Sequence, residues 1–594
     1  MSDYRAPVKD MRFVINELAG LARINELPGF EEATPDLVDA VLEEAGQLAA
    51  EVISPTNAIG DSQGCQLKDG QVYVPEEFKA AYRQYAEGGW PGIAMDPEYG
   101  GQGLPTLVGT AVEEMLQSAN LAWSLGPLLT EGAIHAIELH GTAELKDKFL
   151  EPMISGQWTG TMNLTESQAG SNLAAIRTQA VPEGDIYKVT GQKIFITWGD
   201  HDMTDNVIHL VLARTPDAPA GVKGLSLFVV PKMQINADGS VGERNGVTTV
   251  SVEHKLGIHG SPTCVLDFAN AEGYLVGEIG AGLANMFTMM NRARLSVGLE
   301  GVAITERSYQ QALAYALERI QGGGPGHEGD VAIIQHPDVR RMLLTMKATN
   351  EAMRAMAYVN AAHIDQAERA TDESERAAHQ ARVDLLTPVV KGWLTENSQA
   401  LTSLGIQVHG GMGYVEETGA AQHYRDARIL TIYEGTTGIQ AADLVGRKIL
   451  RDGGAAVNDL LDEMAALDTE LVAAGDELST IHAAHIAGVS GLRESVKWLL
   501  ENAATDANVP GGVSYHLLMQ AGTVVGGWHM ARAGLVAKQK LDDGVADADF
   551  YRGKLLTARF YAEQVMPLAY SHARSVRAGS DTIMAFSLEQ FQNE

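Results

Sequence analysis

The chain of 594 residues has few cysteines and no long apolar run, and each deficit excludes a class of protein. Cys65 and Cys264 are its only cysteines, and they stand far apart without a Cys-x-x-Cys pair or a Cys/His cluster. We therefore expect neither a disulfide framework nor a metal site, and both thiols should be reduced packing residues. No apolar run approaches the ~20 residues that a membrane-spanning helix requires, so no membrane partner is expected.

Basic residues are also scarce, because 44 lysines and arginines stand against 76 acidic residues, which gives a net charge of −32. This balance argues against nucleic acid or an anionic membrane as the main partner. A polyanionic ligand would require local basic residues that offset the overall field. The opening residues 1–7 contain no apolar signal region, and their charges do not suit a transit peptide. We therefore predict a cytoplasmic protein.

The length of the chain exceeds the size at which one hydrophobic core keeps growing, so three or four domains are expected. Residues 1–158 are predicted to form an N-terminal α-helical domain, since residues 108–150 are rich in Ala, Leu and Glu. Residues 159–275 instead hold short β-rich runs, such as 207–212 and 225–231, bounded by turn residues. Such runs without helices between them predict a middle antiparallel β-domain.

Helical patterns return in residues 276–450, which are predicted to form a C-terminal α-helical domain. Leu283, Met286 and Met290 lie on one helical face, and this face is interpreted as core because methionine fills irregular apolar gaps. Residues 451–594 carry three further amphipathic stripes without lysine or arginine clusters. They predict a helical extension that packs against the body or a second subunit. The fold class is therefore multidomain α+β.

The most informative segment is residues 432–440, Ile-Tyr-Glu-Gly-Thr-Thr-Gly-Ile-Gln. It places one carboxylate, Glu434, in a Gly-flanked turn before a helical pattern. If water is excluded, desolvation raises the pKa of such a carboxylate toward the working pH and suits it to act as a general base. Alternatively, the segment is an ordinary helix start in which Thr436 or Thr437 is the cap and Glu434 only favours the helix N-terminus.

Other motifs accompany this turn in a fixed order. They are residues 162–172, 191–197, 407–414 and 424–428. In this order and at these separations, the segments resemble the acyl-CoA dehydrogenase family of flavoproteins, from about residue 80 to about residue 450. A lone Gly-rich turn would be a weak signal, whereas several independent motifs are a specific one.

The resemblance implies a fold, a cofactor and a reaction. It assigns the C-terminal α-domain to a four-helix bundle and implies FAD as the cofactor. The reaction would be α,β-dehydrogenation of an acyl-CoA to a trans-2-enoyl-CoA, with Glu434 taking the α-proton. Electrons would pass to an electron-transfer flavoprotein. Two alternatives share the fold: an acyl-CoA oxidase that uses oxygen, and a non-catalytic acyl-CoA-binding scaffold, against which the presence of Glu434 argues.

The same resemblance predicts the residues that hold the flavin. An isoalloxazine ring needs a flat apolar wall and hydrogen-bond donors at its polar edge. Phe195 would supply the wall, and Thr165 and Thr197 would supply donors; the alternative is an ordinary turn and a buried strand. The predicted cofactor-binding residues are Met162, Leu164, Thr165, Gly170, Ser171, Phe195, Ile196, Thr197, Arg319, His336, Gln407, Val408, Gly410, Gly411, Thr436 and Gly438.

Within this set, the resemblance places Arg319 on the flavin diphosphate. Gln407 to Gly411 would grip the adenosine end of FAD, commonly from the neighbouring subunit, which predicts a homodimer. The chain departs from the family pattern at two places. Ser167-Gln168 stands where the family commonly has Pro-Gly, and residues 321–330 form a Gly-rich insertion that predicts a flexible loop.

The resemblance also predicts residues that contact the acyl-CoA: Ser171, Asn291, Arg294 and Gly435. For Arg294, pairing with a ligand phosphate or carbonyl and pairing with a neighbouring carboxylate are equally open. Arg292 is interpreted as solvated. Residues 451–594 resemble the C-terminal extension of the larger family members. The acyl group itself cannot be predicted, since the side chains that close such a pocket are scattered across helices.

Overall fold

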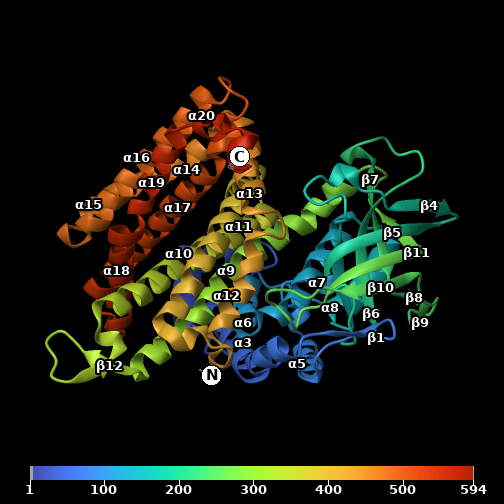
Figure 1. Ribbon diagram of the computed structural model, residues 1–594, viewed down its shortest axis with the longest axis horizontal. Coiled ribbons are helices and arrows are strands. Elements are labelled where there is room, and N and C mark those ends of the chain that lie inside the picture. The colour runs from blue at the N-terminus through green and yellow to red at the C-terminus, as the bar shows by residue number, and fades with distance from the viewer. Residues whose placement is uncertain (1–3, 593–594) are drawn as a thin grey trace. The chain divides into compact units, whose positions relative to one another are not determined.

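The computed structural model describes residues 4–592, and these residues divide into two compact units (Figure 1). The sheet unit comprises Ala40–Ser296 together with residues 4–6. The helical unit comprises Pro7–Asp39 together with the chain from Val297 onward. The helical unit is therefore discontinuous in sequence, with residues 40–296 of the sheet unit inserted after residue 39.

The first part of the sheet unit is helical, as predicted. One of its helices, α7, begins at a capping side chain, since Asn120 accepts a hydrogen bond from the Trp123 N–H at 3.1 Å. A short hairpin that the periodicity did not predict, β1 (Gln66–Lys68) and β2 (Gln71–Tyr73), interrupts the helices. The helices are α3 (Pro35–Gln47), which begins in the helical unit, α4 (Asn57–Gln63), α5 (Glu76–Glu87), α6 (Thr106–Ala119), α7 (Leu121–His140) and α8 (Ala143–Ile154).

Seven strands then form one mainly antiparallel sheet in the order β10-β11-β5-β4-β6-β3, with β7 paired to both β11 and β6. One difference from the prediction is that β3 runs parallel to β6, because the chain crosses over through β4 and β5 before it returns. The strands are β3 (Trp158–Asn163), β4 (Gln179–Glu183), β5 (Ile186–Thr197), β6 (Asn206–Arg214), β7 (Leu225–Pro231), β10 (Val247–Val252) and β11 (Thr263–Val276), with a side hairpin of β8 (Met233–Ile235) and β9 (Val241–Arg244).

The core of the sheet unit lies on this sheet. Val211, Phe228 and Phe268 are buried there, and Cys264 packs among them as a small apolar residue. On the β3 strand, Gly160 permits the close approach of α7, since a Cβ atom at Gly160 would stand 2.5 Å from the Cβ of Ala133. The sheet is thereby fixed against α7 (Figure 1).

Three long helices dominate the helical unit before residue 451: α9 (Gly282–Glu318), which begins in the sheet unit, α10 (Pro337–Arg369) and α11 (Glu373–His409). Asp372 caps α11 by accepting a hydrogen bond from the Glu375 N–H at 2.9 Å. The other elements before residue 451 are α1 (Val8–Phe13), η1 (Val14–Leu18), α2 (Leu21–Asn25), η9 (Gly410–Tyr414), η10 (Glu416–Thr418), α12 (Ala420–Ala427), η11 (Arg428–Thr431), α13 (Thr437–Asp443) and η12 (Leu444–Leu450).

The insertion at residues 321–330 is more ordered than the predicted flexible loop. Its ends pair as the strands β12 (Ile320–Gly323) and β13 (Asp330–Ala332). The Ile333 N–H donates to the Arg319 carbonyl at 2.8 Å and extends the pairing toward α9. The Gly-rich composition thus serves the turn of a hairpin, in which Gly322, Gly326 and Gly329 have positive φ.

The C-terminal extension is helical, as predicted, and its helix α17 packs along α10 and α11 (Figure 1). Gly522 of α17 lies flat against Trp393, whose indole N–H donates to the Thr523 hydroxyl at 3.3 Å. The extension therefore packs against the body of the same chain. Its helices are α14 (Ala455–Ala466), α15 (Asp468–Ala473), α16 (Ser479–Asn502), α17 (Val509–Asp542), α18 (Ala548–Phe560), α19 (Pro567–Arg577), α20 (Asp581–Ala585) and α21 (Leu588–Gln592).

A buried ionic cluster joins the N-terminal segment, the long helices and the extension within the helical unit. Asp10 of α1 accepts from Arg354 of α10 at 2.5 Å and from Lys554 of α18. Arg354 also reaches Glu306 of α9 at 2.9 Å, and Lys554 lies 3.3 Å from Glu351. Burial alone would raise the pKa of Asp10, but the charges of Lys554 and Arg354 outweigh it and hold that pKa well below its usual range.

Among residues 4–592, the helices include none that combines the length and the apolar character needed to cross a bilayer.

Candidate functional site

The turn that carries Glu434 has a strained backbone. Glu434 has φ +53°, a left-handed conformation that is uncommon for a residue with a Cβ atom. Gly435 follows with φ +89°, and the Thr436 hydroxyl accepts from the Ile439 N–H to cap α13. Thr436 is thus the helix cap that the sequence allowed, while Thr437 instead donates to Glu396 at 2.6 Å. A carboxylate in such a conformation persists only where its surroundings hold it there.

Two buried side chains hold this turn through its carbonyl groups. The ammonium group of Lys391, on α11, donates to the carbonyls of Leu430 at 2.8 Å and Gly435 at 2.7 Å. The Gln440 amide donates to the carbonyl of Glu434 at 3.0 Å. The carbonyl groups on both sides of Glu434 are thereby fixed, and the direction of its side chain is set by the backbone rather than by a flexible loop.

A second carboxylate lies beneath the same turn. Glu300, on α9, is fully buried, and its Oε2 accepts a hydrogen bond from the hydroxyl of Tyr433. Desolvation raises the pKa of Glu300 to about 8; the Tyr433 bond and the charge of Lys391 oppose this shift, and the charge of Glu434 adds to it. Glu300 is therefore mainly neutral at pH 7.

In the sheet unit, the predicted flavin loop is fixed by a buried ion pair that the sequence reasoning missed. Lys193 is fully buried and donates to the Leu164 carbonyl at 3.0 Å and to Glu166 at 2.9 Å. Glu166 also accepts from the Thr178 N–H at 3.0 Å and from the Gln168 amide at 2.6 Å. Burial lowers the pKa of Lys193 to about 8, although the charge of Glu166 opposes the shift. The loop is thus held without the Pro-Gly pair.

Phe195, the predicted flavin wall, has two unusual properties. Its side chain is 60% exposed, and its backbone has φ +59°. The neighbouring Ile196 is buried in the sheet core, while the Ile194 N–H donates to the Thr165 carbonyl at 2.9 Å and joins the strand to the flavin loop. An exposed aromatic ring on a strained strand end fits the flat apolar wall that an isoalloxazine requires. The structure therefore brings together the predicted loop and strand.

The remaining predicted flavin residues of the loop and strand differ in their exposure. Met162, Thr165 and Thr197 are half-buried, Leu164 is buried, and Gly170 and Ser171 are exposed. The hydroxyls of Thr165 and Thr197 and the exposed backbone of Gly170 and Ser171 can therefore supply donors. This donor set fits the polar edge of a flavin.

Two predicted FAD residues flank the β12–β13 hairpin that the insertion forms. Arg319 donates to the Gln321 side chain at 3.2 Å, and the ring of His336 lies 2.9 Å from the Gln321 carbonyl. The insertion thus places Gln321 between the two residues. The guanidinium of Arg319 is exposed, which leaves it accessible to a diphosphate.

The Gly-rich segment at the end of α11 is exposed where it was predicted to approach FAD. Gln407, Gly410 and Gly411 are exposed, and Gly410 has φ +59° with nothing within 4 Å of a Cβ atom placed there. Val408 is buried and anchors the segment. His409 is also buried, where its ring lies against Tyr315 and its Nδ1 is 2.7 Å from the Gly405 carbonyl.

The predicted substrate residues show different degrees of burial. Arg294 is buried and lies over the Phe287 ring at 5.7 Å, with its Nη1 3.5 Å from Asn291. Asn291 is exposed. Arg292 was interpreted as solvated but is half-buried, and it donates to Thr106 at 3.1 Å. The correction follows from the packing of α9 on α6, which a single helical stretch does not show.

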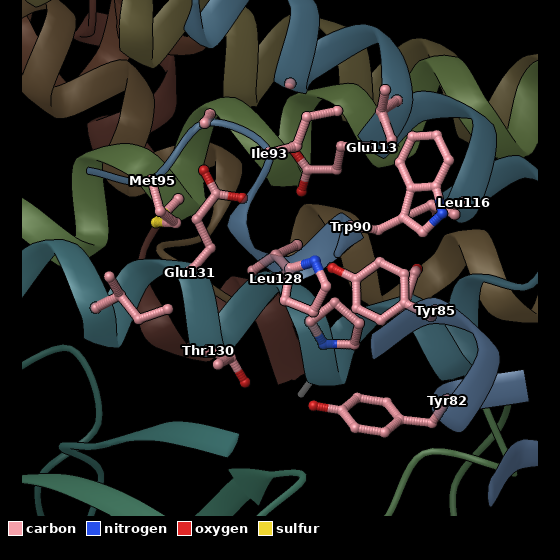
Figure 2. Close-up of a pocket in the computed structure, with 17 residues that line it drawn as sticks. Tyr82, Tyr85, Trp90, Ile93, Met95, Glu113, Leu116, Leu128, Thr130 and Glu131 are labelled. Carbon is pink, nitrogen blue, oxygen red and sulfur yellow. The ribbon is translucent and has the colours of Figure 1, made fainter. Parts of the chain in front are cut away.

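A cavity of about 40 Å³ lies among the helices of the sheet unit (Figure 2). Tyr85, Trp90 and Leu128 supply apolar walls, and the carboxylates Glu113 and Glu131 border it. A cavity of this size holds only a few water molecules. None of the predicted flavin or substrate residues lines it, so we assign it no part in the chemistry.

The helical domain, the mainly antiparallel sheet and the long-helix bundle, with a carboxylate in a left-handed turn, define the architecture of a flavin-dependent acyl-thioester dehydrogenase. Four family models match the chain: the acyl-CoA dehydrogenase N-terminal domain at residues 38–157, middle domain at 161–271 and C-terminal domain at 280–450, and an acetyl-CoA dehydrogenase C-terminal like domain at 458–587.

A full-length relative gives the same result. The chain is 46% identical over 590 residues to the 3-methylmercaptopropionyl-CoA dehydrogenase of Ruegeria pomeroyi, a match that covers 98% of this chain and 100% of the relative. The chain therefore belongs to the acyl-CoA dehydrogenase family. This confirms the predicted family and its C-terminal extension.

Two solved structures confirm the predicted fold class. The Caenorhabditis elegans ACDH-11 in complex with C11-CoA aligns with a TM-score of 0.75 at 21% identity and covers 95% of this chain and 93% of its own. An acyl-CoA dehydrogenase from Bacillus anthracis complexed with FAD aligns with a TM-score of 0.74 at 21% identity, over 93% of this chain and 90% of its own. FAD is the cofactor of the family, as predicted.

Two structural features of the site were not found from the sequence. Glu300 stands alone in the apolar helical stretch of residues 297–304, and a single carboxylate on an apolar helix face is a signal that could have found it. Lys391 also occupies an apolar helical stretch, which is equally unusual for a lysine. Their partners lie far along the chain, so the sequence could flag the residues but not their contacts.

Proposed function

We propose that this protein oxidises acyl-CoA thioesters to trans-2-enoyl-CoA and passes the electrons to an electron-transfer flavoprotein. Glu434 is the general base that takes the α-proton. The observation that carries this proposal is the left-handed turn, in which Gln440 holds the carbonyl group of Glu434 and Lys391 holds that of Gly435. Such a turn presents a carboxylate in one direction, and preorganisation of this kind is what a base requires.

The other predicted residues take their roles by resemblance. The backbone N–H of Glu434 polarises the thioester carbonyl and acidifies the α-hydrogen, as an oxyanion hole does. Ser171, Asn291, Arg294 and Gly435 contact the acyl-CoA. When bound, FAD supplies the acceptor for the hydride that leaves the β-carbon. Phe195 holds one face of the cofactor, and its exposed ring and strained backbone support this role.

The proposed substrate class includes short thioesters such as 3-methylmercaptopropionyl-CoA, because the relative that is 46% identical carries that name. The direct test is to mix the flavin-loaded protein with a panel of acyl-CoA thioesters and record flavin absorbance in a rapid-mixing instrument. Bleaching by at least one thioester supports the proposal. Binding of thioesters without any bleaching would favour the scaffold alternative, and rapid return of the colour in air with peroxide formation would favour the oxidase.

We expect the purified protein to be yellow and to release FAD, not FMN, on denaturation. The reason is that Arg319 and residues 407–411 are proposed to hold the diphosphate and adenosine parts of the cofactor. Replacing Arg319 with glutamine should weaken FAD binding roughly 10- to 100-fold, the size expected for a hydrogen bond to a charged group. The measurement is FAD titration of the apoprotein.

The matched control for this titration is Arg341→Gln, since Arg341 is exposed and pairs with Asp338 at 2.8 Å on the same helix. The control should bind FAD as tightly as the unmodified protein. A colourless protein that takes up no FAD would contradict the assignment of the cofactor, and equal affinities for both variants would remove Arg319 from the site.

We further propose that the protein is a homodimer, because the family completes each FAD site with residues of a neighbouring subunit. The exposed glycines at the end of α11 support this. Sedimentation velocity should show a dimer at micromolar concentration that carries FAD. A monomer that retains stoichiometric FAD would contradict the shared site.

We also propose the domain limits and a cytoplasmic location. The domain limits at residues 158, 275 and 450 are supported by the family models, whose matches start and end near them. The cytoplasmic location rests on composition, and cell fractionation would test it.

A further inference from the structure

Glu300 is a buried acid next to the turn that carries Glu434, the proposed base. It lies on α9, and Tyr433, the residue before Glu434, donates its hydroxyl hydrogen bond to Oε2 of Glu300. The other carboxyl oxygen, Oε1, is buried with no hydrogen-bond partner among the described residues. Burying an ionised carboxylate with one oxygen unpaired costs several kcal/mol. The neutral acid avoids most of this cost, so the geometry itself favours a protonated Glu300.

Among the described residues, three polar or charged side chains act on Glu300. Tyr433 donates the hydrogen bond, Lys391 on α11 contributes a positive charge, and Glu434 contributes a negative one. Lys391 is already committed to the carbonyls of Leu430 and Gly435. Lys391 therefore holds the two ends of the turn, at Leu430 and Gly435, while Glu300 holds the side chain of Tyr433 between them.

We propose that Glu300 is a positioning residue for the base: its neutral carboxyl group holds Tyr433 and thereby the strained turn that presents Glu434. The proposal rests on the function proposed above, with Glu434 as the base. Tyr433 and Glu434 are adjacent in the chain, so a shift of the Tyr433 ring rotates the peptide group that sets φ of Glu434. A misplacement of about 1 Å at a catalytic group can cost 10²-fold in rate.

The first test compares two variants of Glu300 in the flavin-loaded enzyme. Glu300→Gln keeps an acceptor for Tyr433 and imitates the neutral acid, so the rate of flavin reduction at pH 7 should stay within about threefold of the unmodified enzyme. Glu300→Leu removes the acceptor and leaves the Tyr433 hydroxyl buried without a partner, so the rate should fall roughly 10- to 100-fold. Rates are expressed per bound flavin, and the thioester Kd should stay unchanged.

The second test is a double-mutant cycle with Tyr433→Phe. If Glu300 acts through Tyr433, the enzyme with both Glu300→Leu and Tyr433→Phe should be no slower than the slower single variant. Effects that multiply would overturn the proposal, because Glu300 would then act by another route. A Glu300→Leu enzyme with full rate per bound flavin would also overturn it, since a residue with a purely structural role changes stability or flavin content instead.

The third test uses the pH dependence of stability. The folded-state pKa of Glu300 is raised to about 8 from 4.5, so between these values the folded protein binds more protons than the unfolded one. The contribution of Glu300 to stability therefore falls as the pH rises from about 4.5 to about 8. Relative to the unmodified enzyme, Glu300→Gln should gain melting temperature progressively across this window. If the difference in melting temperature between the two enzymes stayed constant over this pH range, Glu300 would be ionised throughout it. That result would overturn the proposal that its carboxyl group is neutral.

These results separate the two levels of the proposal. If no thioester reduces the flavin of the unmodified enzyme, the proposed function fails before any variant is compared. If Glu434→Gln still reduces flavin at the normal rate, the assignment of the base fails. If Glu434→Gln is inactive while Glu300→Leu is normal, the function stands and only the inference about Glu300 is overturned.

Discussion

Replacing Glu434 with glutamine should slow flavin reduction by a good thioester about 10²- to 10⁴-fold, the usual contribution of a general base. Glutamine keeps the shape of the side chain but lacks the basic lone pair. The backbone contacts that hold the turn, from Lys391 and Gln440, do not involve the carboxylate and should persist. The variant should therefore retain FAD and bind enoyl-CoA product. Rapid-mixing absorbance measures the rate.

The control for this experiment is Glu501→Gln, a change of the same chemistry at an exposed position of α16. It should reduce flavin at the normal rate. The assignment of Glu434 as the base would be wrong if both variants behaved alike. Loss of FAD from Glu434→Gln would instead show that the carboxylate is needed to form the site, which the absorbance spectrum reports before substrate is added.

The second large effect is expected from Lys554→Met, which should lower the free energy of unfolding by about 3–5 kcal/mol. Lys554 is buried and pairs with Asp10 and Glu351, and methionine would fill a similar volume but leave both carboxylates without their shared cation. Urea denaturation followed by tryptophan fluorescence measures the change. Any intermediate would show as a second transition, and the helical unit should unfold first.

Arg552→Met is the matched control, because Arg552 lies on the same helix but its partner Asp549 and its own side chain are exposed. Exposed pairs of this kind contribute at most about 1 kcal/mol. Acid should destabilise the protein in the same way as the Lys554 substitution. Because the folded protein lowers the pKa of Asp10, this carboxylate stabilises the fold above about pH 3.8, its ordinary pKa, and the stabilisation is lost as the pH falls further. Equal effects of both variants would show that burial of the cluster has no energetic consequence.

Much of the fold could be predicted from the sequence because its elements obey local rules. The short β-rich runs of β6 and β7 and the amphipathic stripes of the extension are predicted directly from neighbouring residues. The parallel pairing of β3 with β6 could not be read, since it depends on where the chain goes between residues 163 and 206. The hairpin of β12 and β13 was missed because glycines mark a turn without showing whether its flanks pair.

The candidate site likewise contains residues that the sequence identified and contacts that it did not. Glu434 and Phe195 were identified by motif, and the structure adds that both have left-handed backbones. The groups that hold the Glu434 turn were invisible to the motif. Lys391 lies 44 residues before Gly435, whose carbonyl it bonds, and Glu300 lies 133 residues before Tyr433. Such contacts depend on how α9 and α11 are placed, and one sequence does not determine that.

The ionic cluster around Asp10 also sets an order of events during synthesis. Asp10 and Lys554 are separated by 544 residues, so the carboxylate leaves the ribosome long before its cation exists. At about 5–20 residues per second this delay lasts roughly half a minute to two minutes. The sheet unit, whose last residue is Ser296, can fold during that interval. The helical unit cannot close until α18 arrives, and until then residues 7–39 are a nascent arm whose apolar face is open to chaperones.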